Sequence, residues 1–485
     1  MNNHAKYYLL LVGAKVLRIP LALLVLSLLS RLIGPEGVGQ WSMLVAVSTF
    51  FHSVFLNWTQ APAVRFGREE WINSNSLSKT WAARWPLIFP GFILALLLLA
   101  LRPFSFFEQL TFLPSSWWPL AVVYLLGLWC LAEVQSLLTI TENFKHLAVL
   151  PLLVDTLLIL FLFILILAPN VELKNNAILG LVFLIAFFWG GAWAKEFIRT
   201  RSWCKQMSWD ETIRLLKFGW PMIPTFAVGY LIDWGDHFLL QHFHEAQQVG
   251  FFHAGYQVML AMMALASPLM VIFLPKLIDM KSVDPNAELD YLDRVVPTVA
   301  ILWLLAIIPG IALIPWVFEI VFGDEFLGAR PAFYILCAAI PGAVFASLYT
   351  VLFNVQGRLG RTGLFHVFMF LANISISFLL IPRWGSLGAA IGTVISYLLI
   401  QGLYIFDQHK HLNISSSNSI ILFLAACLYS TIQLGIGGQT IMRLIVAVAA
   451  MGGLLLIAKR RQICDRELIA SLLPKQLAWM GRLLN

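Results

Sequence analysis

Charged residues are scarce in this chain of 485 residues. They make up 12% of the sequence, whereas hydrophobic residues make up 60% and the mean hydropathy is +0.83. A soluble domain contains roughly 25% charged and about 45–50% apolar residues. The composition therefore excludes a water-soluble fold and predicts a polytopic membrane protein.

Polar and apolar residues do not alternate within the long apolar runs, such as 150–168. A bilayer core of about 30 Å needs about 20 apolar residues per helical crossing, and these runs meet that length. Lipid offers the backbone no hydrogen-bond partner, so each crossing is a helix or a strand of a closed barrel. Barrel strands would alternate, so an all-α membrane protein is predicted.

Several chemical signatures are missing. The five cysteines lack CxxC spacing, so the sequence supports neither a disulfide framework nor a metal site. It contains no Gly-Lys-Ser/Thr and no HExxH motif, which argues against ATP-driven transport by this chain alone and against zinc-protease chemistry. We therefore expect no enzyme activity, no cofactor and no resident metal.

The apolar runs predict about fourteen transmembrane helices. A first block of six at 1–199, a cytoplasmic linker at 200–212 and a second block of six at 213–408 precede a helix pair at 409–460 and an amphipathic cytoplasmic tail at 461–485. The expected helices span 8–33, 38–62, 80–101, 116–139, 146–168, 175–198, 213–241, 247–275, 293–321, 328–354, 361–382, 385–406, 417–435 and 440–459. The longest cytoplasmic connections are expected near 63–79 and 276–292.

Basic residues set the predicted orientation. With the N-terminus inside, most Lys and Arg fall on cytoplasmic segments, as the positive-inside rule requires. The formal charge of +7 is then explained without nucleic acid. Both termini are predicted to be cytoplasmic, and the basic residues on outer segments are Arg31, Arg102, Lys174, Arg330 and Arg383.

An internal echo supports the two blocks. Arg31-Leu-Ile-Gly-Pro-Glu-Gly-Val-Gly39 follows the first predicted helix, and His242-Phe-His-Glu-Ala-Gln-Gln-Val-Gly250 follows the seventh. Each segment ends in Val-Gly and leads into a new apolar run. Two parallel repeats of six helices are consistent with this correspondence.

These segments carry a family resemblance. The loop from Arg31 continues into Gln-Trp-Ser, the seventh helix contains Pro221-Met-Ile-Pro224 and Asp236-His-Phe-Leu-Leu, and Pro382-Arg-Trp-Gly-Ser-Leu-Gly lies between helices 11 and 12. Together they resemble polysaccharide flippases of the multidrug/oligosaccharidyl-lipid/polysaccharide exporter superfamily. Many members carry Arg after the helix 7 aspartate, where this chain has His237.

The resemblance implies two six-helix lobes around a central cavity that opens alternately to each side of a bacterial inner membrane. The implied substrate is an undecaprenyl-diphosphate-linked oligosaccharide for O-antigen (lipopolysaccharide), capsule or exopolysaccharide. The implied partners are that lipid-linked oligosaccharide, membrane lipids, a polysaccharide polymerase and a chain-length regulator. The chain is expected to act as a monomer.

Lys15 and Arg18 are three residues apart and so share one face of the first helix. Each cation costs about 2.5–3.5 kcal/mol at a lipid-exposed helix centre on insertion scales. Either they line a water-filled cavity and bind a diphosphate or acidic sugar, or they snorkel to the inner interface.

Asp155 is the most central acid, and it is either a paired structural group or part of a proton or cation relay. Asp233, Asp236 and the adjacent His237 lie near the outer end of helix 7. They form either a gate or coupling-ion site or an interfacial hydrogen-bond cluster. For Glu133 in helix 4 we expect a structural pairing.

Prolines occupy corresponding helices of the two blocks: Pro20 lies in helix 1, and Pro221 and Pro224 lie in helix 7. Each removes a helical hydrogen bond, which gives either a moving hinge or a static kink. Arg65, near the inner end of helix 2, either faces the cytoplasmic mouth and contacts substrate or anchors the helix at the interface.

Two other functions compete with the flippase. A cation-coupled multidrug exporter would place acids in its cavity, whereas helix 1 carries cations here. A membrane glycosyltransferase or polymerase would need a large periplasmic loop, and the expected outer loops are short.

Overall fold

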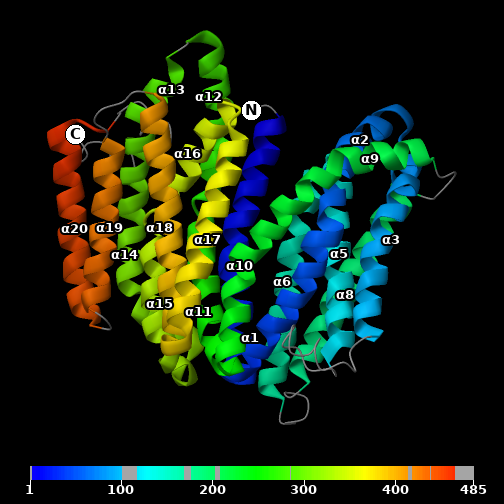
Figure 1. The fold of residues 1–485 in the computed structure, drawn as a ribbon, viewed down its shortest axis with the longest axis horizontal. Coiled ribbons are helices and arrows are strands. Elements are labelled where there is room, and N and C mark those ends of the chain that lie inside the picture. The colour runs from blue at the N-terminus through cyan, green and yellow to red at the C-terminus, as the bar shows by residue number, and fades with distance from the viewer. Residues whose placement is uncertain are drawn as a thin grey trace. The chain divides into compact units, whose positions relative to one another are not determined.

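The computed structural model describes residues 3–100, 117–168, 176–202, 208–284, 286–412, 418–436 and 439–464. The described chain is almost entirely helical (Figure 1). Its α-helices are α1 (Asn3–Phe51), α2 (Gln60–Ser74), α3 (Ser78–Ala100), α5 (Trp118–Ile140), α6 (Phe144–Leu167), α8 (Ala177–Arg199), α9 (Trp209–Gly219), α10 (Ile223–Phe243), α11 (Ala246–Ala264), α12 (Ser267–Val283), α13 (Ala287–Asp290), α14 (Val296–Phe322), α15 (Arg330–Leu336), α16 (Ala343–Val355), α17 (Leu359–Trp384), α18 (Ser386–His411), α19 (Asn418–Ile436) and α20 (Thr440–Arg461).

Twelve helical stretches in the described residues are long and apolar enough to cross a membrane. The first, Leu10–Ser74, has 65 residues and includes the two arms of α1, each long enough for its own crossing. α3, with 23 residues, is a further apolar helix. These helices account for the predicted number of about fourteen, and the all-α polytopic membrane fold is confirmed.

The chain divides into two compact units, Met1–His253 and Ala254–Asn485. In the first unit, α1 packs along α6 and α5 packs along α8. Its core is rich in tryptophan, with Trp81, Trp118, Trp129 and Trp189 all buried. In the second unit, α17 packs on α18 and α14 packs on α20. The predicted lobe boundary at 199/200 differs from this division, and the two-lobe arrangement stays a prediction.

A sharp bend divides α1 into the first two predicted helices (Figure 1). Gly34 has φ 67° and ψ −179°, a conformation that essentially only glycine adopts at low cost. Pro35 follows and has no amide hydrogen to continue the helical pattern. Pro20 lies within the first arm, and the helix continues through it without a break.

The expected connection at 63–79 is wrong in part, because α2 runs through it to Ser74. After the second arm of α1, a π-helical turn at His52–Leu56 and a 3₁₀ turn at Asn57–Thr59 lead directly into α2. The helix ends where Asn75 takes a left-handed φ of 49°. Hydropathy alone missed this helix because much of its surface is charged.

Other predicted spans are interrupted. The span at 213–241 consists of α9, a 3₁₀ turn at Trp220–Met222 and α10. The span at 247–275 breaks between α11 and α12, and α12 extends to Val283, so the expected connection from 276 begins as helix. The span at 328–354 is divided into α15 and α16 by a 3₁₀ turn at Cys337–Ala339 and the bend that follows. Most of the predicted tail at 461–485 lies outside the described residues.

Candidate functional site

The first unit brings together two predicted site residues that lie far apart in the sequence. The Nε atom of Arg18 on α1 donates a hydrogen bond of 2.9 Å to Oδ2 of Asp155 on α6. The Arg18 side chain is 44% exposed, whereas that of Asp155 is 9% exposed. α1 packs along α6, so the buried Asp155 carboxylate can hold the partly exposed Arg18 side chain in place.

The geometry of this pair decides what Arg18 can contact. Its Nε atom is bound to Asp155, and its two terminal nitrogens have no partner among the described residues. A guanidinium held in this way offers two parallel N–H donors to an anionic oxygen pair. Lys15 lies one turn earlier on α1, is exposed, and likewise makes no hydrogen bond or ion pair within the described residues.

A second ion pair is fully buried in the same unit. Both terminal nitrogens of Arg84 on α3 contact the Glu133 carboxylate on α5, at 2.7 and 2.8 Å. Gln60 and Thr59 complete this network with bonds to Glu133 and Arg84. Glu133 is therefore paired as predicted. Arg84 was not singled out from the sequence, although its position within an apolar run was a signal.

Toward the C-terminal end of α10, His237 is buried and meets a second buried histidine. Its Nε2 atom lies 3.0 Å from Nδ1 of His253 on α11. Trp234 covers both rings, with centroids 4.7 Å from His237 and 5.8 Å from His253. One imidazole must donate and the other accept, so the pair holds a single proton between two nitrogens.

The two aspartates of α10 differ in environment. Asp236 is 3% exposed and lies next to His237, whereas Asp233 is exposed. The structure thus separates by burial two aspartates that the sequence groups near one end of helix 7. His253 was not among the residues selected from the sequence, and it lies three residues after Gly250, the last residue of the second echo segment.

The prolines of helix 7 coincide with a break in the helix. Pro221 lies in the 3₁₀ turn that separates α9 from α10, and Pro224 lies in the first turn of α10. Proline is suited to this first turn because its missing amide hydrogen is not needed there. Helix 7 is interrupted at these two prolines, whereas Pro20 causes no comparable break. A hinge at any of the three stays a prediction.

The two segments of the sequence echo pack against each other within the first unit. A Cβ atom added to Gly39 would lie 1.9 Å from the carbonyl oxygen of Ala246, and one added to Gly250 would lie 1.9 Å from that of Pro35. In the echo, Gly39 corresponds to Gly250 and Pro35 corresponds to Ala246. The contact is therefore reciprocal, as a local two-fold relation between equivalent segments would give.

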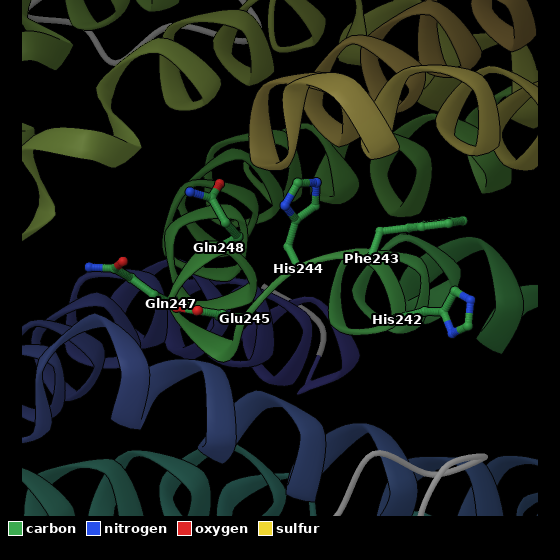
Figure 2. A pocket seen from close by; sticks show the side chains of 6 residues that line it. All are labelled: His242, Phe243, His244, Glu245, Gln247 and Gln248. Atoms are coloured by element: carbon green, nitrogen blue, oxygen red, sulfur yellow. The ribbon is translucent and has the colours of Figure 1, made fainter.

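The turn between α10 and α11 lines an open cavity of about 480 Å³. Figure 2 shows its side chains, with the His242 and His244 rings pointing in different directions. A second cavity of about 500 Å³ lies beside the α1 bend, where Glu36, Gln40 and Asn176 add polar groups to an apolar lining. The residues lining the cavity in Figure 2 are His242, Phe243, His244, Glu245, Gln247 and Gln248.

Arg65 lies on α2, which packs beside α9. Its guanidinium carbon is 4.8 Å from the centroid of the Phe218 ring on α9. The residue is exposed at the end of the unit where α2 and α9 meet. The structure thus places Arg65 apart from the Arg18–Asp155 pair, on a different helix and with different neighbours.

Comparison with known proteins identifies the family. A family model described as polysaccharide biosynthesis protein matches residues 5–280, more than half of the chain. The chain belongs to this family. This match confirms the predicted resemblance at the level of the polysaccharide biosynthesis family.

Solved structures show the same fold. The lipid II flippase MurJ, in an inward closed conformation, matches with a TM-score of 0.69 and 15% identity, covering 94% of this chain and 100% of that one. A mutant of the Vibrio cholerae MATE transporter VcmN matches with a TM-score of 0.52 and 15% identity over 87% of this chain and 98% of that one. The eukaryotic MATE transporter AtDTX14 matches with a TM-score of 0.50 and 14% identity over 88% of this chain and 98% of that one.

A curated sequence relative matches over a shorter region. An uncharacterised membrane protein of Methanocaldococcus jannaschii is 31% identical over 97 residues, which are 19% of this chain and 18% of that protein. The match thus spans about a fifth of the relative's length.

Proposed function

We propose that this protein is a flippase that moves an undecaprenyl-diphosphate-linked oligosaccharide across the bacterial inner membrane. Membership of the polysaccharide biosynthesis family supports a role in surface-glycan assembly. The fold that the chain shares with MurJ supports a large lipid-linked cargo. The proposed products are O-antigen, capsule or exopolysaccharide precursors.

The Arg18–Asp155 pair is the observation that carries the proposal. Asp155 fixes the orientation of Arg18 and leaves its terminal nitrogens without a partner in the described chain. An exposed cation on a membrane-spanning helix is costly against lipid, so it requires water or an anion beside it. Arg18 and Lys15 would hold the diphosphate, Arg18 through forked hydrogen bonds and Lys15 as a point charge.

Asp155 therefore has a positioning role in this proposal rather than a role in an ion relay. The buried carboxylate balances the guanidinium charge when no substrate is bound. The diphosphate would bind the terminal nitrogens while Asp155 stays on Nε, so it would meet a guanidinium whose charge is already partly balanced. This would keep binding reversible, as release on the opposite side of the membrane requires.

The conformational cycle would use residues of α10 and α11. The break at Pro221 and Pro224 supplies a flexible point between α9 and α10, and the His237–His253 pair near Asp236 supplies a proton site for coupling. Asp233 is exposed at the same end of α10 and would take part in gating. Alternating access between two lobes around a central cavity completes this part of the proposal.

The proposal includes the orientation, oligomeric state and partners of the protein. Both termini would face the cytoplasm, and the protein would work as a monomer without enzyme activity. It would deliver its cargo to a polysaccharide polymerase that acts with a chain-length regulator.

Surface-glycan assembly tests the proposal. The Lys15→Gln/Arg18→Gln variant should abolish glycan production in a deletion strain while protein level stays unchanged. The matched control is Lys79→Gln/Arg201→Gln, which removes two exposed cations at one end of the same unit and should retain production. Full glycan production by the first variant would refute the proposed diphosphate contacts.

A companion variant separates binding from folding. Arg18→Gln leaves the buried Asp155 carboxylate without its partner, so its protein level is compared with that of Arg18→Gln/Asp155→Asn, in which two neutral amides replace the ion pair. This second variant should keep the wild-type protein level and still lack glycan production. Restored glycan production would show that Arg18 serves only to neutralise Asp155.

The MATE-like fold favours a second candidate, a cation-coupled multidrug exporter. A susceptibility panel on a deletion strain tests it. Hypersensitivity to cationic drugs together with normal surface glycan would favour the exporter over the flippase.

A further inference from the structure

Two arginines and two phenylalanines form a cluster where α2 meets α9, which we name the arginine–phenylalanine platform. Its members are Arg65 and Phe66 on α2 and Arg214 and Phe218 on α9. The two rings meet edge to face with centroids 5.6 Å apart. Arg65 lies 4.8 Å from the Phe218 centroid, and Arg214 lies 4.2 Å from the Phe66 centroid.

The local sequence places these side chains on facing helix surfaces. On α9, Arg214 and Phe218 are four residues apart and so lie one above the other. Acidic residues Asp210 and Glu211 in the first turn and Lys217 in the last turn suit the helix dipole. Thr212 fixes α9 to α3 by donating to the carbonyl oxygen of Ala83 at 3.0 Å. The platform thus rests on two anchored helices.

The N–H donors of Arg65 have no hydrogen-bond partner within the described residues. The Arg65 guanidinium lies over the Phe66 and Phe218 rings, and within the described residues no hydrogen bond or ion pair engages its N–H groups. Neighbouring Arg68, by contrast, donates to Glu142 and to the carbonyl oxygen of Ile140. Arg65 is therefore held in place by stacking while its donors stay available.

Arg214 is only loosely neutralised. Its nearest carboxylate oxygens belong to Glu69 at 3.5 Å and Glu211 at 3.6 Å, and both acids are about half exposed. These contacts are longer than a charge-assisted hydrogen bond of about 2.7–2.9 Å. The guanidinium groups of Arg65 and Arg214 therefore keep N–H donors that can bind an additional anion.

Exposed apolar side chains also occur on α9 and just beyond its end. Ile213 is 45% exposed, and Trp220, just beyond the end of α9, is 56% exposed. A helix with apolar and basic residues on its surface is typical of a membrane interface, where aromatic and basic side chains meet lipid headgroups. A lipid with an anionic headgroup would match both the charges and the apolar surroundings.

We propose that the arginine–phenylalanine platform binds the phosphate headgroup of a membrane lipid. Arg65 and Arg214 would donate to the phosphate oxygens, while the lipid chain would lie against the apolar side chains of α9. Two sources share this chemistry, a polyprenyl diphosphate and an anionic phospholipid. For the polyprenyl diphosphate the inference rests on the proposed function, and the platform would then be a docking point separate from Arg18.

Lipid binding to the purified full-length protein tests the platform. The probes are farnesyl diphosphate and short-chain phosphatidylglycerol, with farnesol as the uncharged control, titrated in detergent and quantified by native mass spectrometry. Arg65→Gln should weaken binding of at least one anionic probe about tenfold, as expected for the loss of a charge-assisted contact. Arg201→Gln, which removes an exposed arginine at the same end of the unit, should stay within about twofold of the unchanged protein.

Two conservative variants guard against misfolding. Arg65→Lys keeps the charge but lacks the planar fork, so it should recover only part of the affinity. Phe218→Leu keeps the apolar packing but removes the ring face, and should weaken binding about two- to fivefold. Unchanged affinity of Arg65→Gln and Phe218→Leu for both anionic probes would overturn the proposal.

The same titration separates the lipid sources and the two proposals. Preference for farnesyl diphosphate assigns the site to the polyprenyl substrate, and preference for phosphatidylglycerol assigns it to bulk lipid. The measurement is repeated on the Lys15→Gln/Arg18→Gln background. Sensitivity to Arg65→Gln that persists there supports the platform even if glycan assembly turns out not to depend on Lys15 and Arg18.

Discussion

The reciprocal glycine contact gives the sharpest structural prediction. Gly39→Ala places a methyl group 1.9 Å from the carbonyl oxygen of Ala246, and Gly250→Ala does the same toward Pro35. Ordinary van der Waals contact at this oxygen begins near 3.4 Å. The backbones must therefore separate by about 1.5 Å, because a carbonyl oxygen, unlike a flexible side chain, cannot turn aside.

The cost follows from over-packing a close backbone contact. Such insertions typically cost about 1–3 kcal/mol, so each variant should lower the thermal unfolding temperature of the protein in detergent by several degrees. The double variant should be less destabilised than the sum of the single ones, because both methyl groups force apart the same crossing.

Gly13→Ala is the matched control on the same helix. Nothing lies within 4 Å of a Cβ added at Gly13, so this variant should be neutral or slightly stabilised through better helix propensity. Thermal unfolding followed by fluorescence measures all four proteins. Equal unfolding temperatures for Gly39→Ala and Gly13→Ala would refute the close contact and, with it, the local two-fold relation.

Three further predictions concern other groups. Arg84→Gln leaves the Glu133 carboxylate buried without its partner, so it should lower the free energy of unfolding by roughly 3–5 kcal/mol and reduce protein level. Arg84→Gln/Glu133→Gln should recover part of that level; equal levels in wild type and both variants would contradict a structural role. His237→Gln, which removes one member of the His237–His253 pair, should preserve protein level but flatten the pH dependence of glycan-precursor translocation in vesicles; an unchanged profile would exclude the pair from coupling. Burial raises the pKa of the Cys464 thiol to about 11, so maleimide labelling should be slow at pH 7 and rise as pH approaches that value, because only the thiolate reacts; rapid labelling at pH 7 would contradict this.

The membrane fold was predictable because lipid imposes a strict demand on each crossing. About 20 apolar residues are needed per helix, and the chain supplies such runs repeatedly. The same criterion failed at α2, whose charged surface made a real helix resemble a loop. It also joined α9 to α10, because hydropathy does not register the break around Pro221.

Several members of the candidate site were selected from the sequence, but their pairings were not, and His253 and Arg84 were missed. Lys15, Arg18 and Asp155 stood out as charges in apolar runs, yet nothing in their spacing joins Arg18 to a residue 137 positions away. The His237–His253 contact likewise depends on how two helices pack. The echo between 31–39 and 242–250 was visible, but only the structure shows the two segments in contact.

The central claim is transport of a lipid diphosphate, and reconstitution tests it most directly. Proteoliposomes containing the purified protein and a fluorescent undecaprenyl-diphosphate oligosaccharide should move the sugar between leaflets much faster than protein-free liposomes, as measured by protection from an external glycosidase. Lys15→Gln/Arg18→Gln proteoliposomes should fall to the protein-free rate, and Lys79→Gln/Arg201→Gln proteoliposomes should not. A wild-type rate equal to that of protein-free liposomes would contradict the account.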